Sequence, residues 1–237
     1  MSVPFLMLPG HMCDRRLWSL VEPDLLTSGR QVHHADMTGD DSIAGLASAI
    51  LSAAPARFIA VGLSMGGIVA FELLRQQPSR VAALVLSDTN PAPEPSERAA
   101  VRRAQQASVR DGNLADVVRN ELKPACVAPS NRDRRDILDL AFDMALELGP
   151  DVFLRQSEAL ITRADSRLTL AEIDCPTLVL CGSEDSVCPP AWHRDMARAI
   201  PRAKLHLIAG SGHLPPLEQP KHFSAAILNW LDALEQE

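Results

Sequence analysis

The stretch Gly62-Leu63-Ser64-Met65-Gly66-Gly67 joins an apolar run, Phe58–Leu63, to a helical pattern that begins at Met65. The apolar run predicts a buried strand of a parallel sheet, so Ser64 stands at a tight strand-to-helix corner. Flanking glycines leave room in such a corner where a side chain would collide. The N–H groups and positive dipole end of the following helix would face an oxyanion that forms near Ser64. By itself, the pattern fits either a nucleophilic serine or an incidental serine in a glycine-rich turn.

Short apolar runs alternate with helical patterns along the rest of the chain, which is typical of β-α-β units. The predicted strands are Val3–Leu8, Gln31–Met37, Phe58–Leu63, Val81–Asp88, Thr177–Cys181 and Leu205–Ala209. The predicted helices between them are Arg15–Leu26, Ser42–Ala53, Met65–Gln77, Pro190–Ala199 and Glu218–Leu234. The fold class is therefore α/β, with a mostly parallel, doubly wound sheet of about six strands and helices on both faces.

The alternation stops between Pro91 and Thr169, where only helical patterns occur. The Pro91-Ala-Pro-Glu-Pro95 segment predicts an extended hinge, because each proline disfavours helix at the residue before it. Predicted helix caps and stops follow at Ser96, Gly112, Asn113, Ser130 and Gly149-Pro150. We expect residues 1–90 and 170–237 to form the core, and residues 91–169 to form a helical cap of about four helices inserted between two strands.

Two further polar residues follow predicted strands near the end of the chain. Asp185 comes after the strand in Cys181-Gly-Ser-Glu-Asp185, and His213 follows the last strand in Gly210-Ser-Gly-His213. Open α/β sheets place their active sites at the edge where the carboxyl ends of parallel strands meet. Serine, acid and histidine in this chain order are the components of a nucleophilic triad. We predict that Ser64 attacks, His213 accepts its proton and Asp185 orients the imidazole.

On these residues, the chain resembles the α/β-hydrolase superfamily over essentially its whole length, in the branch with a helical cap. It looks most like small bacterial carboxylesterases, lactonases and C–C bond hydrolases. The resemblance implies that the N–H groups of Met65 and His11 bind the oxyanion, with Met12 as the less favoured alternative to His11. Two features depart from the family pattern. The chain begins at what resembles the third standard strand, and Pro9-Gly10 stands where His-Gly is usual.

Several other polar residues are given structural interpretations. Asp88 ends an earlier strand, where a minority of relatives carry the acid, but we expect it to cap a turn because Asp185 fits the commoner pattern. Cys13 is predicted to be a small buried hydrophobe. Arg155 and Arg163 could hold a substrate carboxylate, although a solvated helix face is the preferred interpretation. Surface or structural positions are expected for His33, His34, His193, His206 and His222.

The composition limits the partners and the compartment of this 237-residue chain. Hydrophobic residues make up 46% and charged residues 22%, as in an ordinary globular protein. A net charge of −7 argues against nucleic acid or an anionic membrane as a partner. No targeting segment or membrane span is recognisable, and the five cysteines form no C-x-x-C pair. We therefore expect a cytoplasmic protein that acts on a small molecule, in an oligomeric state that the sequence leaves open.

The predicted reaction is acyl transfer to water through an acyl-enzyme, with small carboxylic esters or lactones as substrates. No metal or organic cofactor is implied, because side chains and backbone fill every role. Three alternatives remain open. A C–C bond hydrolase would use the same triad on a dienolic diketone, and a cofactor-free perhydrolase would use peroxide in place of water. A ligand receptor on the hydrolase fold would respond by cap movement instead of turnover.

Overall fold

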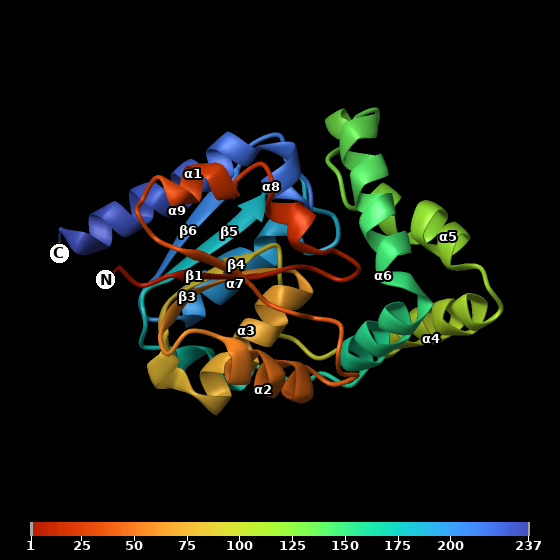
Figure 1. Cartoon of the computed structure of the whole chain (residues 1–237), viewed down its shortest axis with the longest axis horizontal. Helices are drawn as coiled ribbons and strands as arrows, with labels where there is room; N and C mark the ends of the chain where they lie inside the picture. The colour runs from red at the N-terminus through yellow and green to blue at the C-terminus, as the bar shows by residue number, and fades with distance from the viewer. Residues whose placement is uncertain (1, 237) are drawn as a thin grey trace.

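The computed structural model describes residues 2–236, in which a six-stranded sheet carries helices on both faces (Figure 1). The strand order is β2-β1-β3-β4-β5-β6, and each neighbouring pair is parallel. The bounds are β1 Phe5–Leu8, β2 Val32–His34, β3 Phe58–Leu63, β4 Val81–Ser87, β5 Thr177–Gly182 and β6 Ala203–Ile208. The six predicted strands are confirmed, and the sheet is parallel throughout.

Burial explains which strands were easiest to predict. Every residue of β1, β3 and β5 is buried, so these strands appear as continuous apolar runs. The edge strands β2 and β6 are partly exposed and carry mixed residues. For this reason β2 is shorter than the predicted 31–37, and β6 begins at Ala203 and not at Leu205.

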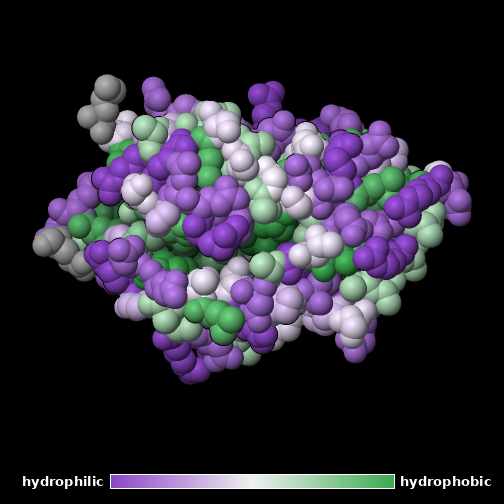
Figure 2. Space-filling view, turned by 90° about the horizontal axis from the view of Figure 1, so that it is seen from below, coloured by the Kyte–Doolittle hydropathy of each residue, from purple (hydrophilic) through white to green (hydrophobic). Residues whose placement is uncertain are grey.

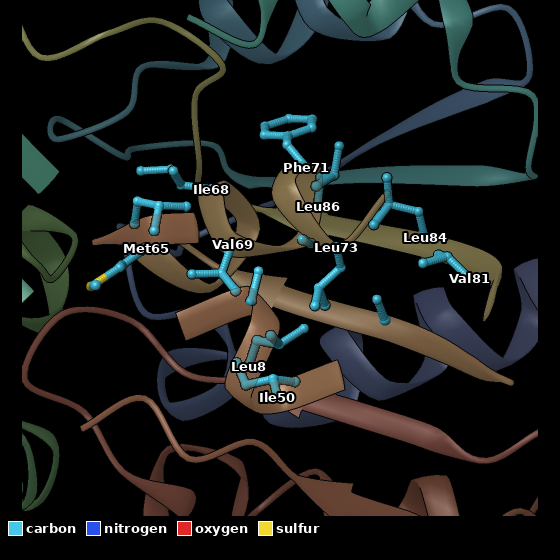
Figure 3. Close-up of a cluster of buried hydrophobic side chains, with 14 of the residues drawn as sticks. Leu8, Ile50, Met65, Ile68, Val69, Phe71, Leu73, Val81, Leu84 and Leu86 are labelled. Carbon is cyan, nitrogen blue, oxygen red and sulfur yellow. The ribbon is translucent and has the colours of Figure 1, made fainter. Parts of the chain in front are cut away.

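The helices of the two sheet faces build separate apolar clusters. Helices α2 (Ile43–Ala53), α3 (Met65–Gln76) and α7 (Pro190–Ala199) pack on one face. Helices α1 (Glu22–Leu26) and α9 (Pro220–Glu235) pack on the other. Side chains alternate along β1, so Leu8 joins the first cluster and Met7 the second. Figure 3 shows part of the first cluster, where side chains of β1, α2, α3 and β4 meet.

Two predicted helices are interrupted by proline. The predicted helix 15–26 is wrong as one element: a 3-10 helix, Arg15–Trp18, precedes the separate α1. A continuous helix would place Pro23 against the carbonyl four residues earlier, which breaks it. The predicted helix 218–234 corresponds to α9, which begins at Pro220. Its first residue, Glu218, instead ends the separate short helix α8 (Pro215–Glu218), because Gln219 precedes Pro220 and adopts a non-helical φ of −137°.

The segment between β4 and β5 is helical, and its helices lie together at one end of the molecule (Figure 1). It contains α4 (Ser96–Arg110), α5 (Leu114–Val117), a π-helical turn (Val118–Leu122), 3-10 turns (Lys123–Ala125 and Pro129–Asn131) and α6 (Arg135–Ile161). Gly149 has a φ of 81° and divides α6 into two helices before Pro150, as predicted. Asn113 occupies the N-cap position of α5, although its side chain makes no cap hydrogen bond.

Two predicted N-caps in this segment are wrong. Ser96 is the first residue of α4, because Pro95 itself takes the extended cap conformation, with a φ of −62° and a ψ of 146°. Ser130 lies in the short 3-10 turn that begins at Pro129, whose ring pre-sets a helical φ, and α6 begins later at Arg135.

The outer surface is mainly polar. Hydrophilic residues cover most of the face in Figure 2, with hydrophobic residues scattered between them. Within residues 2–236, no helix combines the length and the apolar character needed to cross a membrane.

The start of α3 packs too closely on β1 to admit a side chain. A Cβ atom on Gly66 would lie 1.9 Å from the backbone oxygen of Leu8, and both are backbone positions that cannot rotate away. We expect Gly66→Ala to lower the free energy of unfolding by about 3 kcal/mol. Gly39→Ala is the matched control, because nothing lies within 4 Å of its added Cβ. Urea unfolding of both variants tests this, and equal losses of stability would contradict the close-packing argument.

Candidate active site

Ser64 lies at the corner between β3 and α3 with a φ of 53°, a left-handed backbone conformation that is strained for serine. Hydrogen bonds from three directions hold it there. Its N–H donates to the backbone carbonyl oxygen of Ser87, in β4, at 2.9 Å. Its carbonyl accepts from the Thr89 hydroxyl at 2.7 Å and from the N–H groups of Gly67 and Ile68 in α3. The hydroxyl is therefore presented at the strand-end edge of the sheet.

The predicted serine, histidine and aspartate form one chain of hydrogen bonds. The Nε2 atom of His213 lies 2.9 Å from Ser64 Oγ, and its Nδ1 atom lies 2.8 Å from Asp185 Oδ2. His213 follows β6 and Asp185 follows β5, so three strand ends supply the three groups. This geometry allows the hydroxyl proton to pass to the imidazole while the carboxylate fixes the ring orientation.

Asp185 is held in its ionised form. Only 3% of it is exposed, and its Oδ1 accepts the N–H groups of Val187 and Cys188 at 2.8 and 3.0 Å. Burial alone raises the pKa of Asp185, but the adjacent His213 and these N–H donors outweigh it, so the pKa lies below its usual value. Asp185 and His213 also lie close enough to Cys188 for a three-residue metal set, but Asp185 is already satisfied by these hydrogen bonds.

Two backbone N–H groups beside Ser64 have no acceptor within residues 2–236, those of Met65 and His11. The N–H of Met12 is already used, since it donates to Gln156 Oε1 at 2.8 Å. The Nε2 atom of this buried glutamine donates to the carbonyl of Met37 at 2.9 Å, which fixes the amide orientation. Of the two residues considered for the loop after β1, His11 therefore retains a free N–H and Met12 does not.

A cavity of about 240 Å³ opens beside Ser64. The loop after β1, the serine corner and His213 line it. Helix α4 and the turns from residue 121 to 126 line it as well, so the inserted segment supplies much of the wall. The cavity gives a small molecule access to the serine hydroxyl.

A model of the alpha/beta hydrolase family matches residues 5–227. This chain belongs to the α/β-hydrolase family.

Similar proteins include esterases over nearly the whole chain. Pimeloyl-[acyl-carrier protein] methyl ester esterase of Edwardsiella ictaluri is 26% identical over 240 residues, which cover 95% of this chain and 92% of that protein. A thermophilic esterase from Thermogutta terrifontis is 29% identical, has a TM-score of 0.89, and the match covers 98% of this chain and 90% of that one. The chain is accordingly an enzyme of the carboxylic ester hydrolase type.

A shorter match has a different named activity. RutD of Serratia proteamaculans, which is named as a carbamate hydrolase, is 28% identical over 175 residues. The aligned stretch covers 72% of this chain and 64% of that protein. Relatives named as an ester hydrolase and as a carbamate hydrolase therefore both occur for this chain.

Asp88, the alternative acid of this hydrolase, does not bond to His213. Its Oδ1 accepts the Gly182 N–H at 2.8 Å and its Oδ2 accepts the Ser87 hydroxyl at 2.5 Å. Burial, and then the charge of Asp185, raise the pKa of Asp88 well above its usual value. The predicted structural role fits these contacts, although they join two strand ends and do not cap a turn.

Glu218 is a residue at the site that sequence reasoning missed. One carboxylate oxygen accepts the N–H groups of Gly212 and Leu214, which flank His213, at 2.9 and 3.1 Å. The other accepts the Ala128 N–H at 2.8 Å, from the inserted segment. This buried carboxylate therefore positions the histidine loop. The signal in the sequence is an acid soon after the Gly-His-Leu-Pro-Pro turn, at the position where the predicted last helix begins.

The two arginines predicted on the last inserted helix have structural contacts, and Arg163 lies just beyond the end of α6 at Ile161. The prediction of a solvated face is wrong for Arg163, which is buried and pairs with the buried carboxylate of Glu94. Arg155 is half-buried and donates to the Thr38 carbonyl at 2.8 Å. Neither residue lines the cavity beside Ser64, whereas Cys13 is buried as predicted and does line it. Among the predicted structural histidines, His193 is fully buried.

His193 links pH to the stability of the serine corner. Its Nε2 accepts the Thr89 N–H at 3.0 Å, and its Nδ1 faces the Pro189 carbonyl at 3.3 Å. Burial lowers the pKa of His193 to about 4. The unfolded chain, with a histidine pKa of about 6.5, therefore binds a proton between pH 4 and 6.5 that the folded protein excludes. Stability should rise with pH across this window and be lost as the pH falls, by about 3 kcal/mol in full.

The test compares urea unfolding of the wild type and His193→Gln from pH 4 to 7. The glutamine amide can still accept the Thr89 N–H, but it does not bind a proton between pH 4 and 6.5. The difference in the free energy of unfolding between the two proteins should therefore change across this pH range. The comparison isolates His193 from His11, whose pKa burial also lowers. A difference that stays constant with pH would show that His193 is not the titrating group.

Proposed function

We propose that this α/β-hydrolase cleaves small carboxylic esters or lactones through an acyl-enzyme on Ser64. The hydrogen-bonded chain from Ser64 through His213 to Asp185, beside a cavity, carries the proposal. Ser64 Oγ bonds to the substrate carbonyl carbon while its proton moves to His213 Nε2. Asp185 stabilises the imidazolium that forms and holds the ring in the tautomer with the proton on Nδ1.

The carbonyl oxygen becomes an oxyanion in this step and is received by the N–H groups of Met65 and His11. Collapse of the tetrahedral intermediate breaks the bond to the leaving oxygen, which takes the proton from His213 Nε2. Water then attacks the acyl carbon and gives a proton to the same nitrogen. The second collapse releases the carboxylic acid and returns the proton to Ser64. Side chains and backbone of this chain supply every group in the cycle.

The inserted segment is proposed to act as a cap. In this division residues 1–90 and 170–237 form the catalytic core, and residues 91–169 cover its active edge. Support comes from the cavity wall, since α4 and the following turns face Ser64. A cover of this kind limits the access of water and bounds the space for the substrate.

The location of the enzyme is proposed to be cytoplasmic. The five free cysteines fit this location, because thiols stay reduced in the cytoplasm.

Ser64→Ala should abolish nucleophilic catalysis, with a loss in kcat of about a millionfold, because no other group can form the acyl-enzyme. The measurement is hydrolysis of p-nitrophenyl esters of increasing acyl length and of lactones. A fluorophosphonate should label Ser64 alone, and Ser52→Ala, at an exposed position on α2, should behave as the wild type. Labelling at another serine would contradict the proposal. Negligible turnover of all esters and lactones beside rapid cleavage of a dienolic diketone would assign C–C bond hydrolysis instead.

Replacement of the two strand-end aspartates should separate their roles. Asp185→Asn should lower kcat by about ten-thousandfold, because an amide favours the wrong imidazole tautomer. Asp88→Asn should cost less than about tenfold, since Asp88 makes no bond to His213 and an amide oxygen can still accept the Gly182 N–H. Steady-state kinetics with one ester decide the assignment. A larger loss for Asp88→Asn would move the catalytic acid to β4.

A further inference from the structure

Lys123 is a buried cation without an ionic partner. It is 5% exposed and lies in the 3-10 turn Lys123–Ala125 of the inserted segment. Its Nζ atom lies 3.5 Å from the Met12 carbonyl oxygen and 4.0 Å from Cys13 Sγ. Within residues 2–236, no carboxylate lies at ion-pair distance from it. Lysine is almost never buried without a partner, because removing an unpaired ammonium from water is strongly unfavourable.

Lys123 lines the cavity beside Ser64, and its Nζ atom lies next to Cys13, which lines the same cavity. Arg98 of α4 lines the same cavity, is half-buried and has no hydrogen bond or ion pair within the described part of the chain. Arg102, also in the wall, shares the single carboxylate of Glu94 with a second arginine. The only acid that lines this cavity within residues 2–236 is the exposed Glu121.

The cavity is thus positive in a chain whose net charge is −7. A low-dielectric pocket lined by one sign of charge raises the local concentration of ligands of the opposite sign. The contacts of Lys123 are a carbonyl and a thiol at long distance, so at least one of its three N–H donors remains available. An anionic group on a bound molecule would supply the missing counter-charge.

We propose that Lys123, assisted by Arg98, binds an ionised carboxylate that the substrate carries in addition to its scissile ester. Resting on the proposed hydrolase function, this inference names the substrate class as half-esters of dicarboxylic acids and lactones that bear a free carboxylate. Lys123 acts as a point charge, and the Arg98 guanidinium can add a bidentate contact. The carboxylate orients the substrate in the cavity so that its ester carbonyl faces Ser64.

Matched substrates test the inference directly. Monoethyl glutarate and ethyl 5-methylhexanoate have the same shape, since an isopropyl group replaces the carboxylate. The wild type should have at least about tenfold higher kcat/KM for the half-ester. Lys123→Met should remove that preference, with a loss of about 10- to 100-fold for the half-ester, mainly in KM, and little change for the neutral ester. Lys123→Arg should keep most of the preference because it keeps the charge.

Lys221→Met is the control for net charge, because Lys221 is exposed and pairs with Asp24 away from the cavity. It should leave the preference unchanged. The wild type alone provides a second measurement that needs no variant to fold. Glutarate should inhibit competitively and raise the Tm, and neutral glutaramide should do neither.

The outcomes separate the two proposals. Equal kcat/KM for the two esters, with no inhibition by glutarate, would overturn the carboxylate subsite and leave the esterase intact. No turnover of either ester and no phosphonate labelling would overturn the proposed function. In that case the Tm measurement still decides the carboxylate subsite. A rise in Tm when glutarate is added to Lys221→Met, with no rise for Lys123→Met, would establish the subsite. No rise in Tm for either variant would reject it.

Discussion

The close approach of the first turn of α3 to the ends of β1 and β4 is the constraint on which the active edge depends. Gly66 lies so near the Leu8 carbonyl that no side chain fits, and Ser64 is bonded to β4 through its N–H. Three strand ends therefore meet at one point. This contact brings the loop after β1 beside the N–H of Met65, so a single packing requirement places both the nucleophile and the proposed oxyanion donors. The strained φ of Ser64 is maintained because hydrogen bonds to its backbone N–H and carbonyl fix the conformation of this residue.

A second set of contacts ties the inserted segment to the same edge. The side chain of Gln156 in α6 accepts the Met12 N–H. The carboxylate of Glu218 accepts the Ala128 N–H of the inserted segment and the N–H groups of the two residues that flank His213. Both side chains are buried, where hydrogen bonds are strong and an unsatisfied donor is costly. A shift of α6 would therefore disturb the loop after β1. The inserted helices are part of the positioning of the site as well as a wall of its cavity.

These long-range contacts are the part of the structure that local sequence patterns do not predict. Strands buried on both faces and the Gly-rich serine corner have local patterns, so the sheet and the proximity of Ser64, Asp185 and His213 could be predicted from them. Gln156 and Glu218 are polar residues on helices, which look like surface positions until partners 144 and 90 residues away are known. The buried pair of Arg163 with Glu94 escaped prediction for the same reason. Local rules also failed at Ser96 and Ser130, where adjacent prolines decided the helix ends.

The positive charge of the cavity beside Ser64 comes from some of its basic side chains and not from others. His11, next to the proposed oxyanion position, could add a further positive charge, but burial, and then Arg102 and Lys123, hold its pKa well below the usual value. Its imidazole therefore stays neutral at neutral pH and packs on Phe153 at a ring-centre distance of 5.4 Å. The positive side chains in the cavity wall are then those of lysine and arginine. A carboxylate bound there would be balanced by Lys123 and Arg98, while His213 is the imidazole that hydrogen-bonds to Ser64.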